Sequence, residues 1–334
     1  MLYNKRMIEC LSNECWINPQ IDFLLFLQNI RIGHFEMFDQ FFLSVTIFGE
    51  MWLPTLICAA IYWCIDFKSG LYLFSLSSVN MLLSQFFKMI ACVYRPWVLS
   101  DKIHPVEQAV VLAKGYSFPS GHSAQASAVF GGLALLLWKK KPIAILLILL
   151  ALLVGFSRMW LGVHTPQDVI VGLMIGFPLV FILNWAINWA EKNINRYLYL
   201  LAGIDIAAIF VILYVCYLNS YPIDYVDGKL LVNPHSSIQT IIVSYGYVLG
   251  IINGAFICRR FFPFNPKEGS LTSKLVRAIV GFVLTTLLFN NVLRILFCNP
   301  CDFKIGLAIP FLIGFFVTGI YPYLFSKYGQ ILKK

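Results

Sequence analysis

Long apolar runs recur through almost the whole of this sequence, separated by short polar segments that carry most of the charge. Nine of them are about as long as a membrane-crossing helix, which needs roughly 20 apolar residues. Inside a bilayer the chain must satisfy every backbone polar group itself, so such runs fold as helices. Only 12% of the 334 residues are charged, well below the fraction typical of a soluble domain. The sequence therefore predicts an all-α, polytopic membrane bundle. We expect spans near residues 50–66, 71–93, 121–138, 142–160, 166–189, 198–219, 236–257, 278–297 and 305–326.

The N-terminal residues differ from the rest of the chain. Residues 1–20 are polar and hold no apolar core of a cleavable signal peptide, so we expect the first membrane helix to direct insertion. Residues 21–34 predict a short amphipathic helix, too short to span the bilayer. This helix is expected to lie in the membrane interface.

The distribution of lysine and arginine predicts the orientation. Alternate loops are strongly basic, and the positive-inside rule places such loops in the cytoplasm together with the C-terminus. The other loops, which hold the polar clusters described next, are then extracytoplasmic or lumenal. The net charge of +9 follows from this bias, so we expect no nucleic-acid partner. The basic residues of the predicted cytoplasmic loops and C-terminal tail are Lys68, Lys139–Lys141, Lys192, Arg196, Arg259, Arg260, Lys267, Lys274, Lys327, Lys333 and Lys334.

Three polar clusters lie at the ends of apolar runs, where lipid-facing sequence carries no charge. Together they contain three permanent cations, two histidines, one carboxylate and a Pro-Ser-Gly turn. Three fixed cations suit a small polyanion such as phosphate. Two histidines offer a nucleophile and a proton donor. The set predicts phosphoryl transfer without a metal or another cofactor. The clusters are Lys88 to Arg95-Pro96, Pro119-Ser120-Gly121-His122, and Ser157-Arg158 with His164 and Asp168.

His164 is the predicted nucleophile. Asp168 lies four residues later, about one helical turn, and can hydrogen-bond one imidazole nitrogen while the other attacks phosphorus. Thr165-Pro166 is typical of a helix start, with Thr165 as the N-cap. The alternative is therefore an Asp168 that only stabilises this helix start.

His122 is the predicted general acid that protonates the leaving oxygen. It falls in the first turn of the third predicted span, where Ser120 can cap the helix and Gly121 permits close backbone approach. The helix N-terminus then offers N–H groups to phosphate. The alternative is a capping turn with an incidental histidine.

Lys88, Arg95 and Arg158 are the predicted phosphate clamp. Their charges would stabilise the equatorial oxygens as the transition state forms. The alternative is that each cation extends to the lipid headgroups, as single residues near helix ends often do.

The pattern Lys-x6-Arg-Pro, Pro-Ser-Gly-His and Ser-Arg-x5-His-x3-Asp resembles the type 2 phosphatidic acid phosphatase (PAP2) superfamily, which includes glucose-6-phosphatases and vanadium haloperoxidases. Every motif position matches, in order, within residues 40–190. The resemblance implies a phosphohistidine intermediate on His164. It divides the chain into an N-terminal polar segment and interfacial helix (1–36), a six-helix catalytic core (37–197) and about three further transmembrane helices (198–334).

The resemblance predicts a vanadate-sensitive membrane hydrolase that acts on a lipid phosphate. Phosphatidic acid, prenyl diphosphate and sphingoid phosphate types are all admissible, and Gly-Glu-x-Trp at 49–52 looks somewhat like the sphingosine phosphate and dolichyl diphosphate branch. A sugar phosphatase like glucose-6-phosphatase and a non-catalytic lipid-binding member remain alternatives. The expected partners are the lipid substrate and the bilayer.

Four cysteines lie outside the apolar runs, in segments predicted to be extracytoplasmic. Thiols there tend to oxidise, so local pairs within each segment are expected, with cross-pairing and four free thiols as alternatives. These residues are Cys10, Cys15, Cys298 and Cys301.

Overall fold

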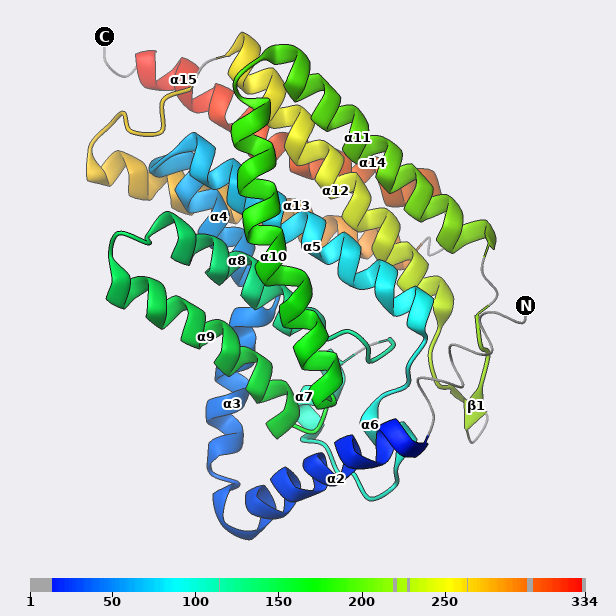
Figure 1. The fold of residues 1–334 in the computed structure, drawn as a ribbon. Coiled ribbons are helices and arrows are strands. Elements are labelled where there is room, and N and C mark those ends of the chain that lie inside the picture. Colours follow the sequence, from blue (N-terminus) through cyan, green and yellow to red (C-terminus); the bar gives the residue numbers. More distant parts are fainter. Residues whose placement is uncertain are drawn as a thin grey trace. The chain divides into compact units, whose positions relative to one another are not determined.

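The computed structural model describes residues 14–113, 115–218, 221–226, 229–262, 264–298 and 303–331 (Figure 1). Helices make up most of these residues, which confirms the predicted all-α class. The α-helices are α2 (Glu14–Ile30), α3 (Phe38–Thr46), α4 (Trp52–Cys64), α5 (Phe67–Ala91), α6 (Pro96–Leu99), α7 (Glu107–Leu112), α8 (Gly121–Leu136), α9 (Lys141–Trp160), α10 (Pro166–Ala190), α11 (Ile194–Leu213), α12 (Pro234–Phe261), α13 (Leu271–Cys298), α14 (Phe303–Phe315) and α15 (Tyr321–Ile331).

Shorter elements join some of these helices. A small antiparallel hairpin of two-residue strands precedes α12. The turns are η1 (Arg31–Phe35), η2 (Ile47–Gly49), η3 (Tyr214–Leu218) and η4 (Phe316–Ile320), and the strands are β1 (Tyr225–Val226) and β2 (Lys229–Leu230).

Seven helical segments of the described chain are long and apolar enough to cross a membrane, and each coincides with or overlaps one predicted span. The first predicted span, 50–66, contains the helix Trp52–Cys64, which is apolar enough to cross a membrane only together with the helix over Phe38–Gly49 that precedes it. The third forms α8, whose 16 residues reach only about 24 Å. Most of α8 is buried by protein, so it lies among other helices rather than against lipid. The protein is a multi-pass membrane protein.

The chain folds as two compact units built from separated segments. Unit 1 comprises residues 1–53, 83–181 and 213–238. Unit 2 comprises residues 54–82, 182–212 and 239–334. The three segments predicted from the family resemblance, 1–36, 37–197 and 198–334, are continuous stretches of sequence and not packing units. That division stays a prediction.

In unit 1, α8 and α9 form an antiparallel hairpin closed by a tight turn (Figure 1). Helix α10 approaches α8 closely because Gly172 faces its start: a Cβ there would lie 2.6 Å from the carbonyl oxygen of Ser120. Helix α3 packs along α9, where the rings of Phe42 and Trp160 lie 4.9 Å apart. This packing fixes the ends of α8, α9 and α10 that carry the polar clusters.

Helix α2 is longer than the amphipathic helix predicted over 21–34, but it has the expected two faces. Ile21, Leu24 and Leu27 are buried at a spacing of three residues, and this face packs against Ile103 and α9. Phe26, on the other face, is 58% exposed. A helix with one apolar face outside the protein suits the membrane interface.

In unit 2, α12 packs against α14 and η4 through small residues. A Cβ at Gly254 would lie 2.9 Å from the carbonyl oxygen of Phe315, and Thr318 Oγ1 donates to the carbonyl oxygen of Ile251 at 2.8 Å. Small residues at such spacing allow membrane helices to approach closely.

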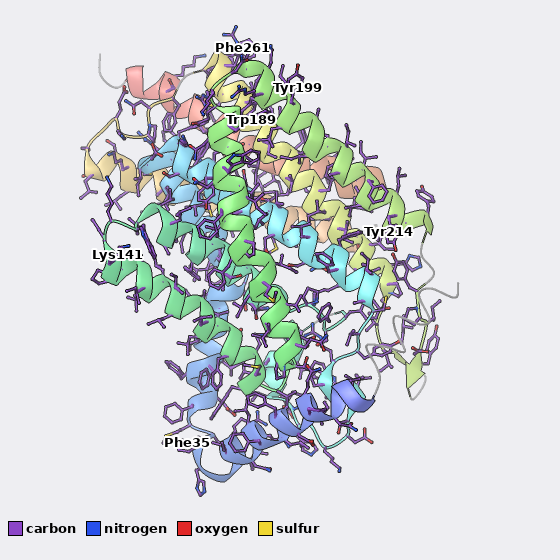
Figure 2. The ribbon with its side chains drawn as sticks, viewed as in Figure 1. Phe35, Lys141, Trp189, Tyr199, Tyr214 and Phe261 are labelled. Carbon is purple, nitrogen blue, oxygen red and sulfur yellow. The ribbon has the colours of Figure 1, made fainter. Side chains whose placement is uncertain are left out.

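Three of the predicted basic loops meet at one end of unit 2. Glu191 forms ion pairs with Lys68 at 2.5 Å and with Arg259 at 2.9 Å. Figure 2 shows Trp189 and Phe261 at the same end of this unit. Aromatic and basic residues together are typical of a helix end at the membrane surface.

Candidate active site

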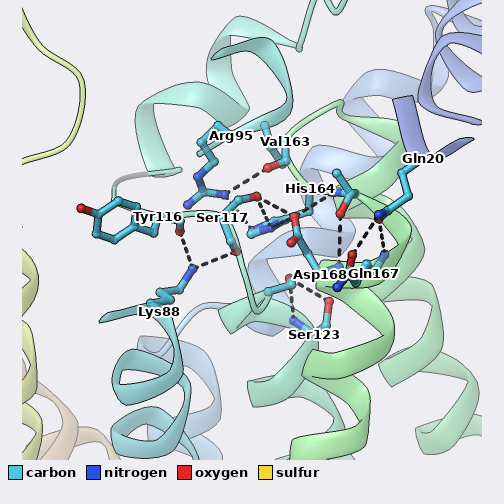
Figure 3. A network of polar contacts seen from close by, with 12 residues as sticks. Gln20, Lys88, Arg95, Tyr116, Ser117, Ser123, Val163, His164, Gln167 and Asp168 are labelled. Carbon is cyan, nitrogen blue, oxygen red and sulfur yellow. Dashed lines mark hydrogen bonds and ion pairs between the residues drawn. The ribbon is translucent and has the colours of Figure 1, made fainter. Parts of the chain in front are cut away.

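The three predicted clusters come together in unit 1. Their side chains project from the C-terminal parts of α5 and α9, from the N-termini of α8 and α10, and from the connecting loops. Figure 3 shows Lys88, Arg95, His164 and Asp168 gathered around Ser117. The cations are largely inaccessible to solvent: Lys88 is 6% exposed, Arg95 5% and Arg158 0%. Cations that extend to headgroups remain accessible at their charged ends, so the alternative role for them does not fit this burial.

His164 and Asp168 are joined by a hydrogen bond. The Nδ1 atom of His164 lies 3.2 Å from Oδ2 of Asp168, and its Nε2 atom lies 2.9 Å from Nη1 of Arg95. Because a guanidinium can only donate, Nε2 is the acceptor here and carries the lone pair. Nδ1 then carries the proton and donates it to Asp168. This tautomer leaves the lone pair on Nε2, the nitrogen that would attack phosphorus if His164 is the nucleophile, as predicted.

Asp168 also stabilises the start of α10. Its Oδ2 accepts a hydrogen bond from the backbone N–H of Thr165 at 2.9 Å, while Thr165 Oγ1 accepts from the N–H of Asp168 at 3.3 Å. This reciprocal pair is a capping arrangement. The two interpretations of Asp168 that the sequence leaves open are therefore compatible, because one oxygen serves both contacts.

Ser117 belongs to this network, although the sequence analysis gave it no role. Its Oγ donates to Oδ2 of Asp168 at 2.6 Å and lies 3.3 Å from Nδ1 of His164. Ser117 is fully buried. In the sequence Ser117 is distinguished only by its position two residues before Pro119, and this position does not predict a contact with Asp168 or His164.

Lys88 and Arg95 hold the loop before α8 through backbone carbonyl groups, and Arg95 also holds the loop before α10. Lys88 Nζ donates to the carbonyl oxygens of Tyr116 at 2.7 Å and Ser117 at 3.1 Å. Arg95 Nε donates to Gly115 at 3.1 Å, and its Nη1 donates to Val163 at 3.0 Å. Both cations therefore position the site, besides bringing positive charge to it.

The Pro-Ser-Gly turn leads into α8 as predicted. Ser120 is the N-cap, and its Oγ accepts from the backbone N–H of Ser123 at 3.4 Å and from the Ser123 hydroxyl at 2.8 Å. At Gly121 an added Cβ would meet no atom within 4 Å. A ligand can thus approach the backbone at this helix N-terminus, where N–H groups favour an anion.

Arg158 and His122 carry buried polar atoms for which the described part of the chain supplies no partner. Arg158 Nη1 donates to Thr46 Oγ1 at 2.8 Å, but its Nε and Nη2 atoms have no such contact. The Nε2 atom of His122 is likewise buried and unpaired within the described residues. His122 also lies within electrostatic range of His164. Unpaired buried donors are costly, so these atoms fit a bound anion.

The surroundings of His164 keep its imidazole neutral. Burial lowers the pKa of this group well below its usual range, and the positive charges of Arg95, Lys88 and Arg158 lower it further. A neutral imidazole retains the lone pair that a nucleophile needs.

The described residues contain no group of three or more His, Cys, Asp or Glu side chains placed to hold a metal ion. Of the four cysteines considered in the sequence analysis, Cys10 and Cys301 lie outside the described residues, as do the side chains of Cys15 and Cys298. Their pairing stays a prediction.

Two family profiles match this chain. The PAP2 superfamily matches residues 69–192, and the transmembrane extension of PAP2 superfamily phosphatases matches residues 242–333. The chain belongs to the PAP2 superfamily. The second match covers most of the C-terminal helices. The sequence predicted these helices but gave no function for them.

Several curated proteins resemble part of the chain. Phosphatidylglycerophosphatase B of Bacillus subtilis is 31% identical over 118 residues, which cover 33% of this chain and 55% of that protein. The undecaprenyl-diphosphatase of Sulfolobus acidocaldarius is 33% identical over 115 residues, or 34% of this chain and 53% of that protein. The chain thus spans about half the length of these relatives.

One solved structure is also similar. The crystal structure of the transmembrane PAP2-type phosphatidylglycerolphosphate phosphatase from Bacillus subtilis has a TM-score of 0.45 and 22% sequence identity. The similarity covers 57% of this chain and 94% of that one.

Proposed function

We propose that this protein is an integral membrane phosphatase that hydrolyses a lipid phosphate monoester or diphosphate through a phosphohistidine intermediate. The observation that carries this proposal is the set of buried nitrogen atoms of Arg158 and His122 that have no partner among the described residues and lie near the His164–Asp168 pair. Such atoms match the oxygens of a phosphoryl group.

The reaction begins when Nε2 of His164 attacks phosphorus and the bond to the leaving oxygen breaks. In the free enzyme Nη1 of Arg95 donates to Nε2, so substrate binding must transfer this N–H to a phosphoryl oxygen. Asp168 holds the imidazole in place and stabilises its positive charge as the nitrogen–phosphorus bond forms. Arg158, Arg95 and the N-terminus of α8 surround the equatorial oxygens.

Burial and the charges of Arg158, Arg95 and Lys88 lower the pKa of His122 in the free site, so His122 takes up its proton together with the anionic phosphoryl group, which favours the charged imidazole. It then gives this proton to the leaving oxygen, so that the lipid departs as an alcohol or, from a diphosphate, as a lipid monophosphate. The same imidazole, now neutral, accepts a proton from water as water attacks the phosphohistidine. The nitrogen–phosphorus bond breaks, phosphate leaves, and both histidines return to their starting states.

A lipid substrate is favoured over a sugar by helix α2. Its exposed face carries Phe23 and Phe26, and Gln20 on this helix exchanges hydrogen bonds with Gln167 beside Asp168. An interfacial helix next to the site suits a substrate that is anchored in the membrane. The relatives named as phosphatidylglycerophosphatase and undecaprenyl-diphosphatase also support this class.

The test is phosphate release by purified protein from phosphatidic acid, phosphatidylglycerophosphate, prenyl diphosphate, sphingosine phosphate and glucose-6-phosphate. We expect release from at least one lipid phosphate, persistence of activity in chelator, and loss of activity in His164→Ala. His235→Ala is the matched control because His235 is exposed and matches no motif. Release from glucose-6-phosphate alone would support the sugar phosphatase instead. Activity that disappears in chelator and returns with Mg²⁺ would contradict the metal-free mechanism.

We also propose that the site opens to the extracytoplasmic or lumenal side and that the C-terminus is cytoplasmic. The basic loops, including those joined through Glu191, support this orientation. Asp101 and Lys140 are exposed and fall in loops of opposite predicted sides. A membrane-impermeant maleimide should label Asp101→Cys in intact cells above the wild-type background, and Lys140→Cys only after the membrane is opened. The reverse pattern would place the active site in the cytoplasm.

A further inference from the structure

The short turn η2 lies directly against the predicted general acid. An added Cβ at Gly49 would lie 2.9 Å from Cβ of His122, 3.0 Å from its carbonyl oxygen and 2.8 Å from Cγ1 of Val154. Only glycine leaves enough room for this approach. The residue that follows, Glu50, is thereby fixed beside the N-terminus of α8.

The carboxylate of Glu50 is held in place on this side of the site. Glu50 leaves the turn in an extended conformation, with φ −76° and ψ 155°. Trp52 Nε1 donates to Glu50 Oε2 at 2.8 Å. The carboxylate is close enough to interact electrostatically with the guanidinium of Arg158, which Thr46, on the preceding helix α3, also contacts. Glu50 is partly accessible to solvent.

Asp168 and Glu50, which both act on the cationic cluster, differ in position. Asp168 lies behind the nucleophile and is 1% exposed, whereas Glu50 lies by the residue that protonates the leaving oxygen. In an in-line displacement the leaving group departs opposite the nucleophile. Glu50 is therefore on the side through which the leaving group passes.

Phosphate monoesters and diphosphates differ most in the charge of the leaving group. A phosphate monoester leaves as an alcohol, which has no charge at the reacting oxygen once it is protonated. A diphosphate leaves as a lipid monophosphate, whose anionic oxygens are bonded to the phosphorus next to the broken bond. A fixed carboxylate repels the second leaving group and not the first.

We infer that Glu50 determines specificity by the charge of the leaving group and biases the site towards phosphate monoesters over diphosphates. The inference rests on the proposed phosphatase activity and adds a substrate preference to it. Removing the carboxylate would also leave more of the positive charge of Arg158 available to an anionic leaving group, which acts in the same direction.

The test compares phosphatidic acid with diacylglycerol diphosphate, two substrates that share a lipid and differ by one phosphate. In Glu50→Gln the ratio of kcat/KM for the diphosphate to kcat/KM for the monoester should rise about tenfold, the scale expected for one unit charge acting at several ångströms in a partly exposed site. Glu50→Asp keeps the charge and should stay near the wild-type ratio. Glu36→Gln removes an equal charge from an exposed position and should leave the ratio unchanged.

The ratio does not depend on the amount of folded enzyme, so a partly unstable variant still gives a result. Should Glu50→Gln yield no enzyme, Trp52→Phe removes the N–H that holds the carboxylate and should raise the ratio by a smaller factor. A ratio that is unchanged or lower in the variant that folds overturns the inference. A wild-type enzyme that releases no phosphate from these two lipids or from any lipid phosphate of the panel above overturns the proposed function instead.

Discussion

The Oδ2 atom of Asp168 lies 3.2 Å from Nδ1 of His164 across the start of helix α10. The same oxygen accepts hydrogen bonds from the hydroxyl of Ser117 at 2.6 Å and from the backbone N–H of Thr165 at 2.9 Å. Three donors around one buried oxygen leave the carboxylate little freedom. The orientation of His164, the proposed nucleophile, therefore depends on the fold of the helix start and of the loop before α8.

Replacing Asp168 by asparagine should separate its catalytic role from its role at the helix start. The amide oxygen can still accept from Thr165, but the neutral side chain stabilises a charged imidazole poorly, so we expect kcat to fall about 10³-fold. Thermal unfolding should change little, whereas Asp168→Ala should also lose about 1 kcal/mol of stability with the cap. Asp101→Asn, in an exposed loop, is the control for the amide substitution. A kcat loss smaller than about tenfold in Asp168→Asn would show that the carboxylate mainly caps the helix.

Ser117 is expected to act through Asp168 as a positioning residue. Ser117→Ala removes one of the three donors and should lower kcat about tenfold, in keeping with one hydrogen bond to a charged group. Vanadate affinity should change much less, because the cations and the helix N-terminus are unaltered. Ser44→Ala is the matched control, since Ser44 is exposed and its hydroxyl bonds only within its own helix. Equal losses in kcat and in vanadate affinity would indicate a collapsed loop rather than a positioning effect.

The part of the site that could be predicted from sequence consists of residues that lie close together within one segment of the chain. His164 and Asp168 are one turn apart next to a recognisable helix start, and Ser120-Gly121-His122 is a turn followed by an apolar run. These spacings fix neighbours within one segment before any tertiary contact is known. The residue types of the three clusters predicted phosphate chemistry, and the family resemblance added that the clusters share one site.

The contacts missed from sequence are those between segments. Ser117, Thr46 and Glu50 are ordinary polar residues in their own stretches, and their roles arise from packing against α10, α9 and α8. The carbonyl partners of Lys88 and Arg95 are missed for the same reason, because every residue has a carbonyl group. The spans were predicted well where the helices are long, and α8 differs because burial among neighbouring helices allows a helix of 16 residues in place of a full span.

The pH dependence of the free enzyme should follow His164. Protonation removes its lone pair, and burial together with Arg95, Lys88 and Arg158 holds the pKa of this imidazole well below its usual range. On the acid side kcat/KM should therefore stay constant down to pH values below about 6.5, the usual histidine pKa, and fall only at lower pH.

Arg95→Gln tests the cause of this shift. Removing a nearby positive charge makes the imidazolium less unfavourable, so the pKa of His164 rises and the acid limb of the residual activity moves to higher pH. Lys102→Gln, which removes an exposed charge, should leave the limb in place. An acid limb that does not move in Arg95→Gln would mean that another group controls it.

Vanadate should inhibit competitively and should reveal the contribution of Arg158. Bound vanadate adopts five-coordinate geometry around an attacking histidine, so a site complementary to the transition state binds it more tightly than substrate. Arg158 has two buried nitrogen atoms unpaired within the described residues, and hydrogen bonds to a charged group are worth about 1.5–3 kcal/mol. Arg158→Ala should therefore raise the inhibition constant for vanadate at least tenfold. Arg260→Ala, which removes an exposed arginine from the last turn of helix α12, should leave the constant unchanged. Full activity of the wild-type enzyme in millimolar-order vanadate would contradict the assigned clamp, and an unchanged constant in Arg158→Ala would remove Arg158 from it.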